Sequence, residues 1–127
     1  MHNVSDTEFN QLIAESLDEL PNEYTTRLDN VLITYENQPS PAQREKLHLR
    51  GNQTLFGLYE GVPLPARGNG YQMVLPDRIT LFKYPMLQVA HDSTSLKKQV
   101  KHTLWHEIAH YFGLDHDRIH EIERNWQ

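Results

Sequence analysis

Hydrophobic residues recur at helical spacing near the start of the chain. They follow a helix-start signature in which the Ser5 hydroxyl is expected to accept a hydrogen bond from the amide of Glu8. Pro21 disfavours helical geometry at Leu20, so the pattern predicts a first helix that ends there and a short second helix from Pro21 to Leu28. The apolar positions form one stripe: Phe9, Leu12, Ile13, Leu17 and Leu20.

The middle of the chain predicts strands separated by one helix. Residues 31–36, 54–60 and 78–84 are strand candidates, and the first of these is expected to be the central strand of the sheet. Ser40 followed by Pro41 predicts a helix that ends before Gly51. The Pro/Gly-rich segment 61–77 is predicted to be a long loop, either functional or a simple surface excursion.

The last third of the chain carries the longest predicted helix. Residues 92–95 offer several N-cap side chains, the helix should run to about Phe112, and Gly113 should end it. A short final helix is indicated by Ile119, Ile122 and Trp126. The predicted fold class is therefore α+β, in one domain over residues 1–127: N-terminal helices, a small mixed three-stranded sheet, the long helix and a short C-terminal helix.

Composition and charge narrow the class of protein. With 127 residues, 38% hydrophobic and 23% charged, the chain has the balance of a globular domain. A net charge of −5 without a Lys/Arg cluster argues against a nucleic-acid partner. The absence of cysteine excludes disulfides and thiolate metal sites. Neither a secretory signal nor an apolar run of about 18 residues is found, so we expect a cytoplasmic protein without a membrane partner. The oligomeric state is left open.

Five of the eight histidines lie within residues 102–120. Residues 106–116, HEIAHYFGLDH, match H-E-x-x-H-x-x-G-x-x-H at every fixed position. His106 and His110 stand one turn apart on one helix face, so both imidazoles can reach one zinc ion. Glu107 is turned by about 100° from His106, toward the open side of the metal. A general base for a zinc-activated water must stand on that side.

His116 is the predicted third ligand. Gly113 can end the helix in a left-handed conformation, and the reversed chain can then return the His116 imidazole to the ion. Three protein ligands plus water is the pattern of catalytic zinc sites. His102 lies one turn before His106, but three successive turns splay too widely for one ion, so it is predicted to be a polar neighbour. Other donors could take the third position: Asp117, His120, Glu121 or Glu123.

Four segments outside the motif carry a family resemblance. They are AESLDELP (14–21), LDNV (28–31), LFGLYEGVPL (55–64) and LPDRITL (75–81). With the motif, they resemble the bacterial zincin-like metallopeptidases, small single-domain proteins related to a minimal metzincin core. The resemblance implies an α+β zincin-like fold with His106 and His110 as ligands and Glu107 as base. Metzincins place a methionine turn beneath the metal, but no methionine follows Met86 here, so that support must be absent or replaced.

The sequence thus predicts a zinc-dependent metallopeptidase with one Zn²⁺ per chain, held by His106, His110 and His116. Glu107 would serve as the general base in peptide-bond hydrolysis. Two alternatives stay open. One is a metal-binding regulatory or interaction module without general peptidase activity, and the other is a dedicated protease of a single regulatory protein.

A peptide or protein substrate is the expected partner. It should add as a strand along the edge formed by residues 54–60. Gly57 would either permit close approach of the substrate backbone or meet a packing need. The candidate oxyanion donors are Tyr59, Tyr71 and Tyr111.

Overall fold

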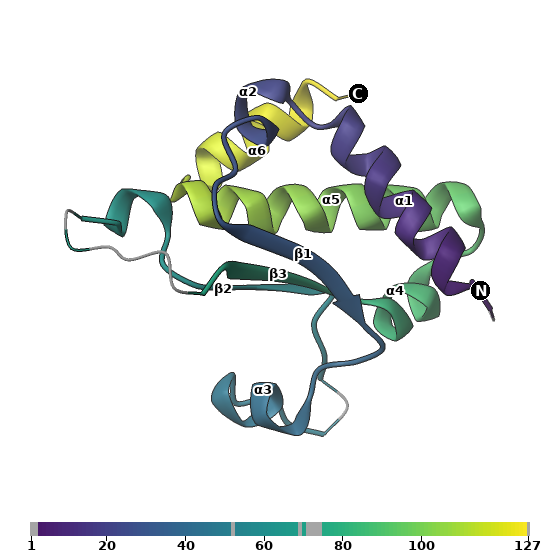
Figure 1. The fold of residues 1–127 in the computed structure, drawn as a ribbon. Coiled ribbons are helices and arrows are strands. Elements are labelled where there is room, and N and C mark those ends of the chain that lie inside the picture. The colour runs from purple at the N-terminus through teal and green to yellow at the C-terminus, as the bar shows by residue number, and fades with distance from the viewer. Residues whose placement is uncertain (1–2, 52, 69, 71–74, 127) are drawn as a thin grey trace.

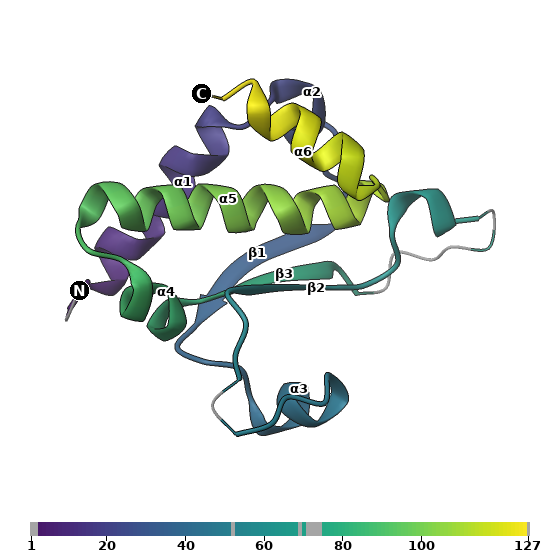
Figure 2. The same ribbon diagram turned by 180° about the vertical axis from the view of Figure 1, so that it is seen from behind.

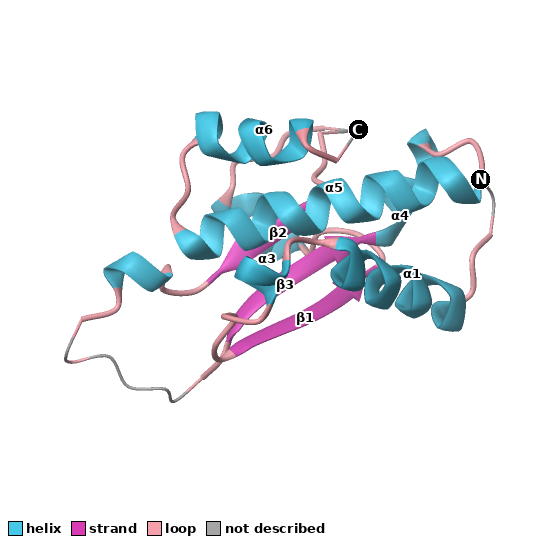
Figure 3. Cartoon of the chain, turned by 90° about the horizontal axis from the view of Figure 1, so that it is seen from above, coloured by secondary structure: helices cyan, strands magenta, loops and turns pink. Residues whose placement is uncertain are grey.

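The computed structural model describes residues 3–51, 53–68, 70 and 75–126. The long helix α5 (Ser93–Phe112) and helix α1 (Asp6–Glu19) lie on one side of a small sheet, and α3 (Pro41–Lys46) lies on the other (Figures 1 and 2). Helix α6 (His116–Arg124) runs beside α5 (Figure 3). This arrangement confirms the predicted α+β class.

The sheet is mixed and has the strand order β1-β3-β2. Strand β1 (Val31–Glu36) pairs in parallel with β3 (Asp77–Phe82), and β2 (Gly57–Glu60) pairs with β3 in the antiparallel sense. The prediction that residues 31–36 form the central strand is wrong, because β3 holds that place. One aromatic side chain of β1 instead contacts α1: the rings of Tyr35 and Phe9 lie 4.8 Å apart.

The starts of the first three helices agree with the sequence. The Ser5 hydroxyl oxygen accepts from the amide of Glu8 at 3.1 Å. Ser40 and Gln43 form both hydrogen bonds of a capping box. The short helix predicted after Pro21 is α2 (Asn22–Thr25).

Two elements differ from the predicted boundaries. Strand β2 begins only at Gly57, and β3 ends at Phe82 because helix α4 (Lys83–Val89) follows it directly. Pro85 stands in the first turn of α4, where its missing N–H would have no helical acceptor in any case. Within the predicted loop, residues 64–66 form a single 3₁₀ turn, η1 (Leu64–Ala66).

Helix α5 is the structural centre of the molecule. It begins after Asp92, whose carboxylate accepts from the amide of Ser95 at 2.8 Å, and it ends at Gly113 with φ of 70°. One face of the helix is fully buried in the core, including Leu104, Trp105 and Ile108. In the part of the chain that the structure describes, no helix has both the length and the apolar character to cross a membrane.

Candidate metal centre

The two predicted ligands and the predicted base come together on α5. The ring centroids of His106 and His110 lie 4.7 Å apart. Among the described residues, one group of three could hold a metal ion, with donor atoms within 4.8 Å of one another: His106, Glu107 and His110. Imidazole nitrogen and carboxylate oxygen are donors that suit zinc, so these residues fit the ion that the motif predicts.

Glu107 is buried and faces one of the imidazoles. Glu107 as a whole is 7% exposed, and its Oε1 lies 3.1 Å from His110 Nδ1. This hydrogen bond raises the pKa of His110, because the carboxylate favours the charged imidazole. Burial lowers the pKa of His106, because the charged form loses hydration. His106 therefore favours the neutral state in which imidazole binds a metal.

His116 is the first residue of α6 and lies next to this group. Its ring centroid is 6.3 Å from that of His106. The left-handed Gly113 reverses the chain after α5. Asp115 then starts α6 by accepting from the amide of Arg118 at 2.8 Å. The role of His116 as third ligand stays a prediction. The Gly113 turn and the Asp115 cap keep the start of α6, and with it the His116 imidazole, near the site.

The edge strand β2 packs directly on the site helix. A Cβ built on Gly57 would lie 2.5 Å from Thr103 Cγ2 and 3.4 Å from Glu107 Cγ. A side chain would therefore push β2 away from α5, so glycine meets a packing need here. The close packing of Gly57 on α5 also places the edge strand β2 beside the buried Glu107.

A buried polar cluster behind the site was not predicted. Arg67 Nη2 donates to Asp77 Oδ2 at 2.7 Å, and the two side chains are only 7% and 5% exposed. Arg67 also donates to the carbonyl oxygens of Val62 at 2.9 Å and Asp29 at 3.1 Å. Its guanidinium stands 5.0 Å from the ring centroid of Tyr111, the residue after His110. Opposite charges within the 61–77 segment were the one sequence signal for this pair.

Two of the candidate oxyanion tyrosines belong to this cluster. The Tyr59 hydroxyl donates to the Asp77 carboxylate, and burial followed by this bond raises the pKa of Tyr59. The fully buried Tyr111 donates to the carbonyl oxygen of Asp29 at 3.1 Å. Both hydroxyls are thus engaged in structural hydrogen bonds. Tyr71 lies outside the described residues.

The loop that Arg67 holds also supports the turn after α5. A Cβ built on Gly113 would lie 2.9 Å from Pro65 Cγ, so η1 sits against the turn that leads to His116. The described part of the predicted loop is therefore fixed to the sheet at Asp77 and to α5 at Gly113. It forms part of the support of the site.

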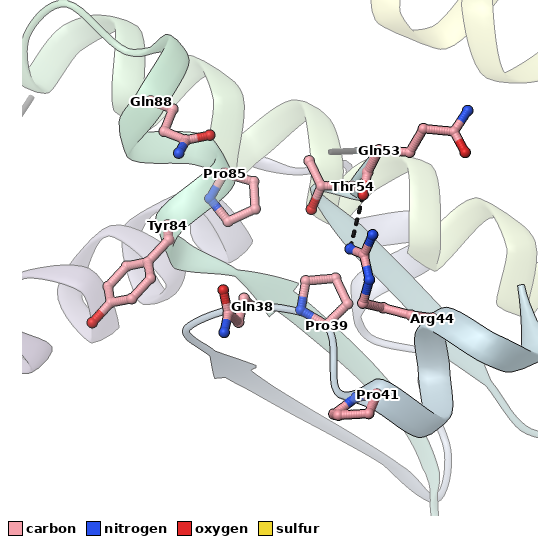
Figure 4. A pocket seen from close by; sticks show the side chains of 9 residues that line it. All are labelled: Gln38, Pro39, Pro41, Arg44, Gln53, Thr54, Tyr84, Pro85 and Gln88. Atoms are coloured by element: carbon pink, nitrogen blue, oxygen red, sulfur yellow. Dashed lines mark hydrogen bonds between the residues drawn. The ribbon is translucent and has the colours of Figure 1, made fainter. Parts of the chain in front are cut away.

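A hollow of about 410 Å³ lies away from the histidines, between the strand ends, α3 and α4. Figure 4 shows Arg44 beside it, donating to the carbonyl oxygen of Gln53 at 2.8 Å. No residue of the histidine motif lines this hollow, so it is separate from the metal centre. Its walls are formed by Gln38, Pro39, Pro41, Arg44, Gln53, Thr54, Tyr84, Pro85 and Gln88.

A small mixed sheet beneath a helix with two histidines one turn apart defines a zincin-like protein. The family model described as zincin-like metallopeptidase matches residues 28–126, and the chain belongs to this family. A solved structure described as a conserved hypothetical protein from Thermus thermophilus is similar in fold, with a TM-score of 0.59 and 21% identity. The match covers 86% of this chain and 94% of that chain. No curated protein matches the sequence.

Proposed function

We propose that this protein is a zinc-dependent peptidase that hydrolyses peptide bonds at the His106–Glu107–His110 group. The observation that carries the proposal is the placement of Glu107. Its carboxylate is buried beside two imidazoles and against an edge strand, where an extended peptide can lie. Membership in the zincin-like metallopeptidase family supports the same reaction class.

His106, His110 and His116 are the residues that would hold the ion. Bound zinc would supply Lewis-acid polarisation of the scissile carbonyl and a lowered pKa of water. The burial of His106 favours its neutral, ligating form. The Gly113 turn and the Asp115 cap position His116 at the start of α6.

Glu107 acts as the general base and then as the general acid. Its carboxylate accepts a proton from the attacking water, and the same oxygen returns the proton to the leaving amine. The side chain is held at the site by burial between α5 and β2. A fixed carboxylate needs little rearrangement between these two proton transfers.

The substrate binds as an added strand along β2. Among the described residues this strand pairs only with β3, so we expect the backbone groups of its other edge to be available to a peptide. Because a Cβ on Gly57 would lie only 3.4 Å from Glu107 Cγ, a peptide on that edge would pass near the base. Main-chain hydrogen bonds would hold it in an extended form suitable for attack.

The test is the Glu107→Gln substitution in zinc-loaded protein, read by mass spectrometry on a diverse peptide library. Cleavage should fall by roughly 10²–10⁴-fold while zinc content stays at the wild-type level, because Glu107 is not a predicted ligand. Glu121→Gln is the matched control, since Glu121 is exposed and pairs with Arg118 at 3.2 Å. Wild-type cleavage rates in Glu107→Gln would refute the mechanism. No cleavage by the zinc-loaded wild type would favour a dedicated protease or a binding module.

A further inference from the structure

One carboxylate holds both ends of the loop that carries η1. The amide of Val62 donates to Asp77 Oδ1 at 3.2 Å, and Arg67 Nη2 donates to Asp77 Oδ2 at 2.7 Å. Arg67 Nε also donates to the carbonyl oxygen of Val62 at 2.9 Å, so its guanidinium joins the two ends. Residues 62–67 therefore form a closed loop that is fixed to β3, the central strand of the sheet.

The same guanidinium reaches the helix that carries the histidines. Arg67 Nη1 donates to the Asp29 carbonyl oxygen at 3.1 Å and to the Tyr111 hydroxyl at 3.4 Å. Tyr111 lies in α5 directly after the predicted ligand His110. One guanidinium can make all these contacts because its five N–H donors form a rigid fork. Arg67 thus fixes the loop to the sheet and to α5 together.

The tip of the loop meets the turn at the end of α5. A Cβ built on Gly113 would lie 2.9 Å from Pro65 Cγ and 3.3 Å from Pro65 Cδ. The turn itself is closed by a hydrogen bond from the Leu114 amide to the Ala109 carbonyl oxygen at 3.0 Å. The position of this turn decides where α6 begins.

His116 is the first residue of α6, and its ring centroid lies 6.3 Å from that of His106. We propose that Arg67 is a positioning residue for the metal site: acting through Pro65 and the Gly113 turn, it holds His116 beside His106. This inference rests on the proposed function, in which His116 is a zinc ligand.

Other contacts hold α6 farther along its length. Ile119 is fully buried, and its carbonyl oxygen accepts from Trp105 Nε1 at 3.4 Å. The Asp115 cap is a bond within the first turn of α6, so it orders that turn without fixing it to α5. Loss of Arg67 should therefore loosen the junction that carries His116 while α6 stays helical.

The first experiment is a double-mutant cycle on zinc affinity, measured in competition with a chromophoric chelator. Arg67→Ala should weaken zinc binding by roughly tenfold, the lower end of what loss of a group that orients a metal ligand costs. In the His116→Ala background it should have no further effect, because the ligand that it positions is absent. Phe82→Leu is the control for loss of stability alone, since this buried residue lies at the opposite end of β3 from Asp77, and it should bind like wild type. Equal weakening in both backgrounds, or none in either, would overturn the proposal.

The second experiment uses metal-free protein and amide hydrogen exchange. It compares Leu114, whose amide closes the turn, with Leu96, whose amide donates to the Asp92 carbonyl oxygen at 3.0 Å at the start of α5. Arg67→Ala should speed exchange at Leu114 by at least about tenfold relative to Leu96, because the turn opens locally. Phe82→Leu should leave this ratio unchanged. An unchanged ratio in Arg67→Ala would overturn the proposal.

Pro65→Gly repeats both measurements and leaves the buried ion pair in place, which matters if Arg67→Ala does not fold. It removes the contact with Gly113, so zinc affinity should fall and the exchange ratio should rise. Wild-type values for both would overturn the proposal. Peptide hydrolysis enters neither measurement, and the exchange ratio needs no zinc, so failure of the proposed peptidase activity is distinguishable from failure of Arg67 to hold the turn.

Discussion

The contact between Gly57 and α5 gives a prediction that joins the fold to the site. In Gly57→Ala, the new methyl group would lie 2.5 Å from Thr103 Cγ2, well inside the 3.5–4.0 Å of an ordinary carbon contact. Such overpacking costs about 1–3 kcal/mol, and the lower entropy of the unfolded alanine chain offsets about 0.4–1 kcal/mol. We expect a net loss of about 1–2 kcal/mol in the free energy of unfolding, measured by urea denaturation. The melting temperature should fall by roughly 4 °C per kcal/mol.

A double-mutant cycle assigns this loss to one pair of atoms. Thr103→Ser removes the methyl group that would collide and keeps the hydroxyl, which accepts from Gln99 Nε2 at 3.2 Å. Gly57→Ala should therefore cost much less in the Thr103→Ser background, with a coupling of about 1 kcal/mol. Gly68→Ala is the control, because a Cβ there meets no atom within 4 Å. Equal stability of Gly57→Ala and wild type, or the absence of coupling, would refute the packing argument.

Two further predictions concern the ligands and their support. His116→Ala should weaken zinc binding by more than roughly tenfold in competition with a chromophoric chelator, whereas Glu121→Ala should bind like wild type; equal affinities would remove His116 from the metal site. Asp77→Asn should cost about 3–5 kcal/mol in urea denaturation, because it removes the buried carboxylate that pairs with the buried Arg67 guanidinium at 2.7 Å. The other carboxylate near Arg67 is that of Asp29, which is exposed and lies 3.9 Å away. A loss below about 1 kcal/mol, the usual value for an exposed pair, would show that this pair is not truly desolvated.

Local signals in the sequence predicted the parts of the fold that depend on neighbouring residues. The caps at Ser5, Ser40 and Asp92 are hydrogen bonds that span three residues, so the sequence alone specifies them. The termination of α5 at Gly113 depends only on the left-handed conformation of that residue. The meeting of His106 with His110 follows from helix geometry.

The wrong predictions concern contacts between distant segments. Central position in the sheet was assigned to residues 31–36 from their β-branched and aromatic residues, yet one of these, Tyr35, packs against Phe9 of α1. The central strand β3 is identified only by its pairing with both β1 and β2. Helix α4 was missed because residues 83 and 84 were assigned to the strand candidate 78–84, whereas α4 begins at Lys83, directly after β3.

The polar cluster shows how the remaining segments of the family resemblance act on the site. Segments 55–64 and 75–81 contribute Tyr59 and Asp77, which with Arg67 hold the loop against α5. The loop in turn brings Pro65 against Gly113, the residue that sets the direction of the chain toward His116. The sequence has no methionine after Met86, and among the described residues this loop packs against the turn that follows α5. The Asp29 amide donates a hydrogen bond to the Tyr111 hydroxyl, 82 residues away in sequence. Contacts between such distant residues explain why the motif alone could not reveal how the loop is held.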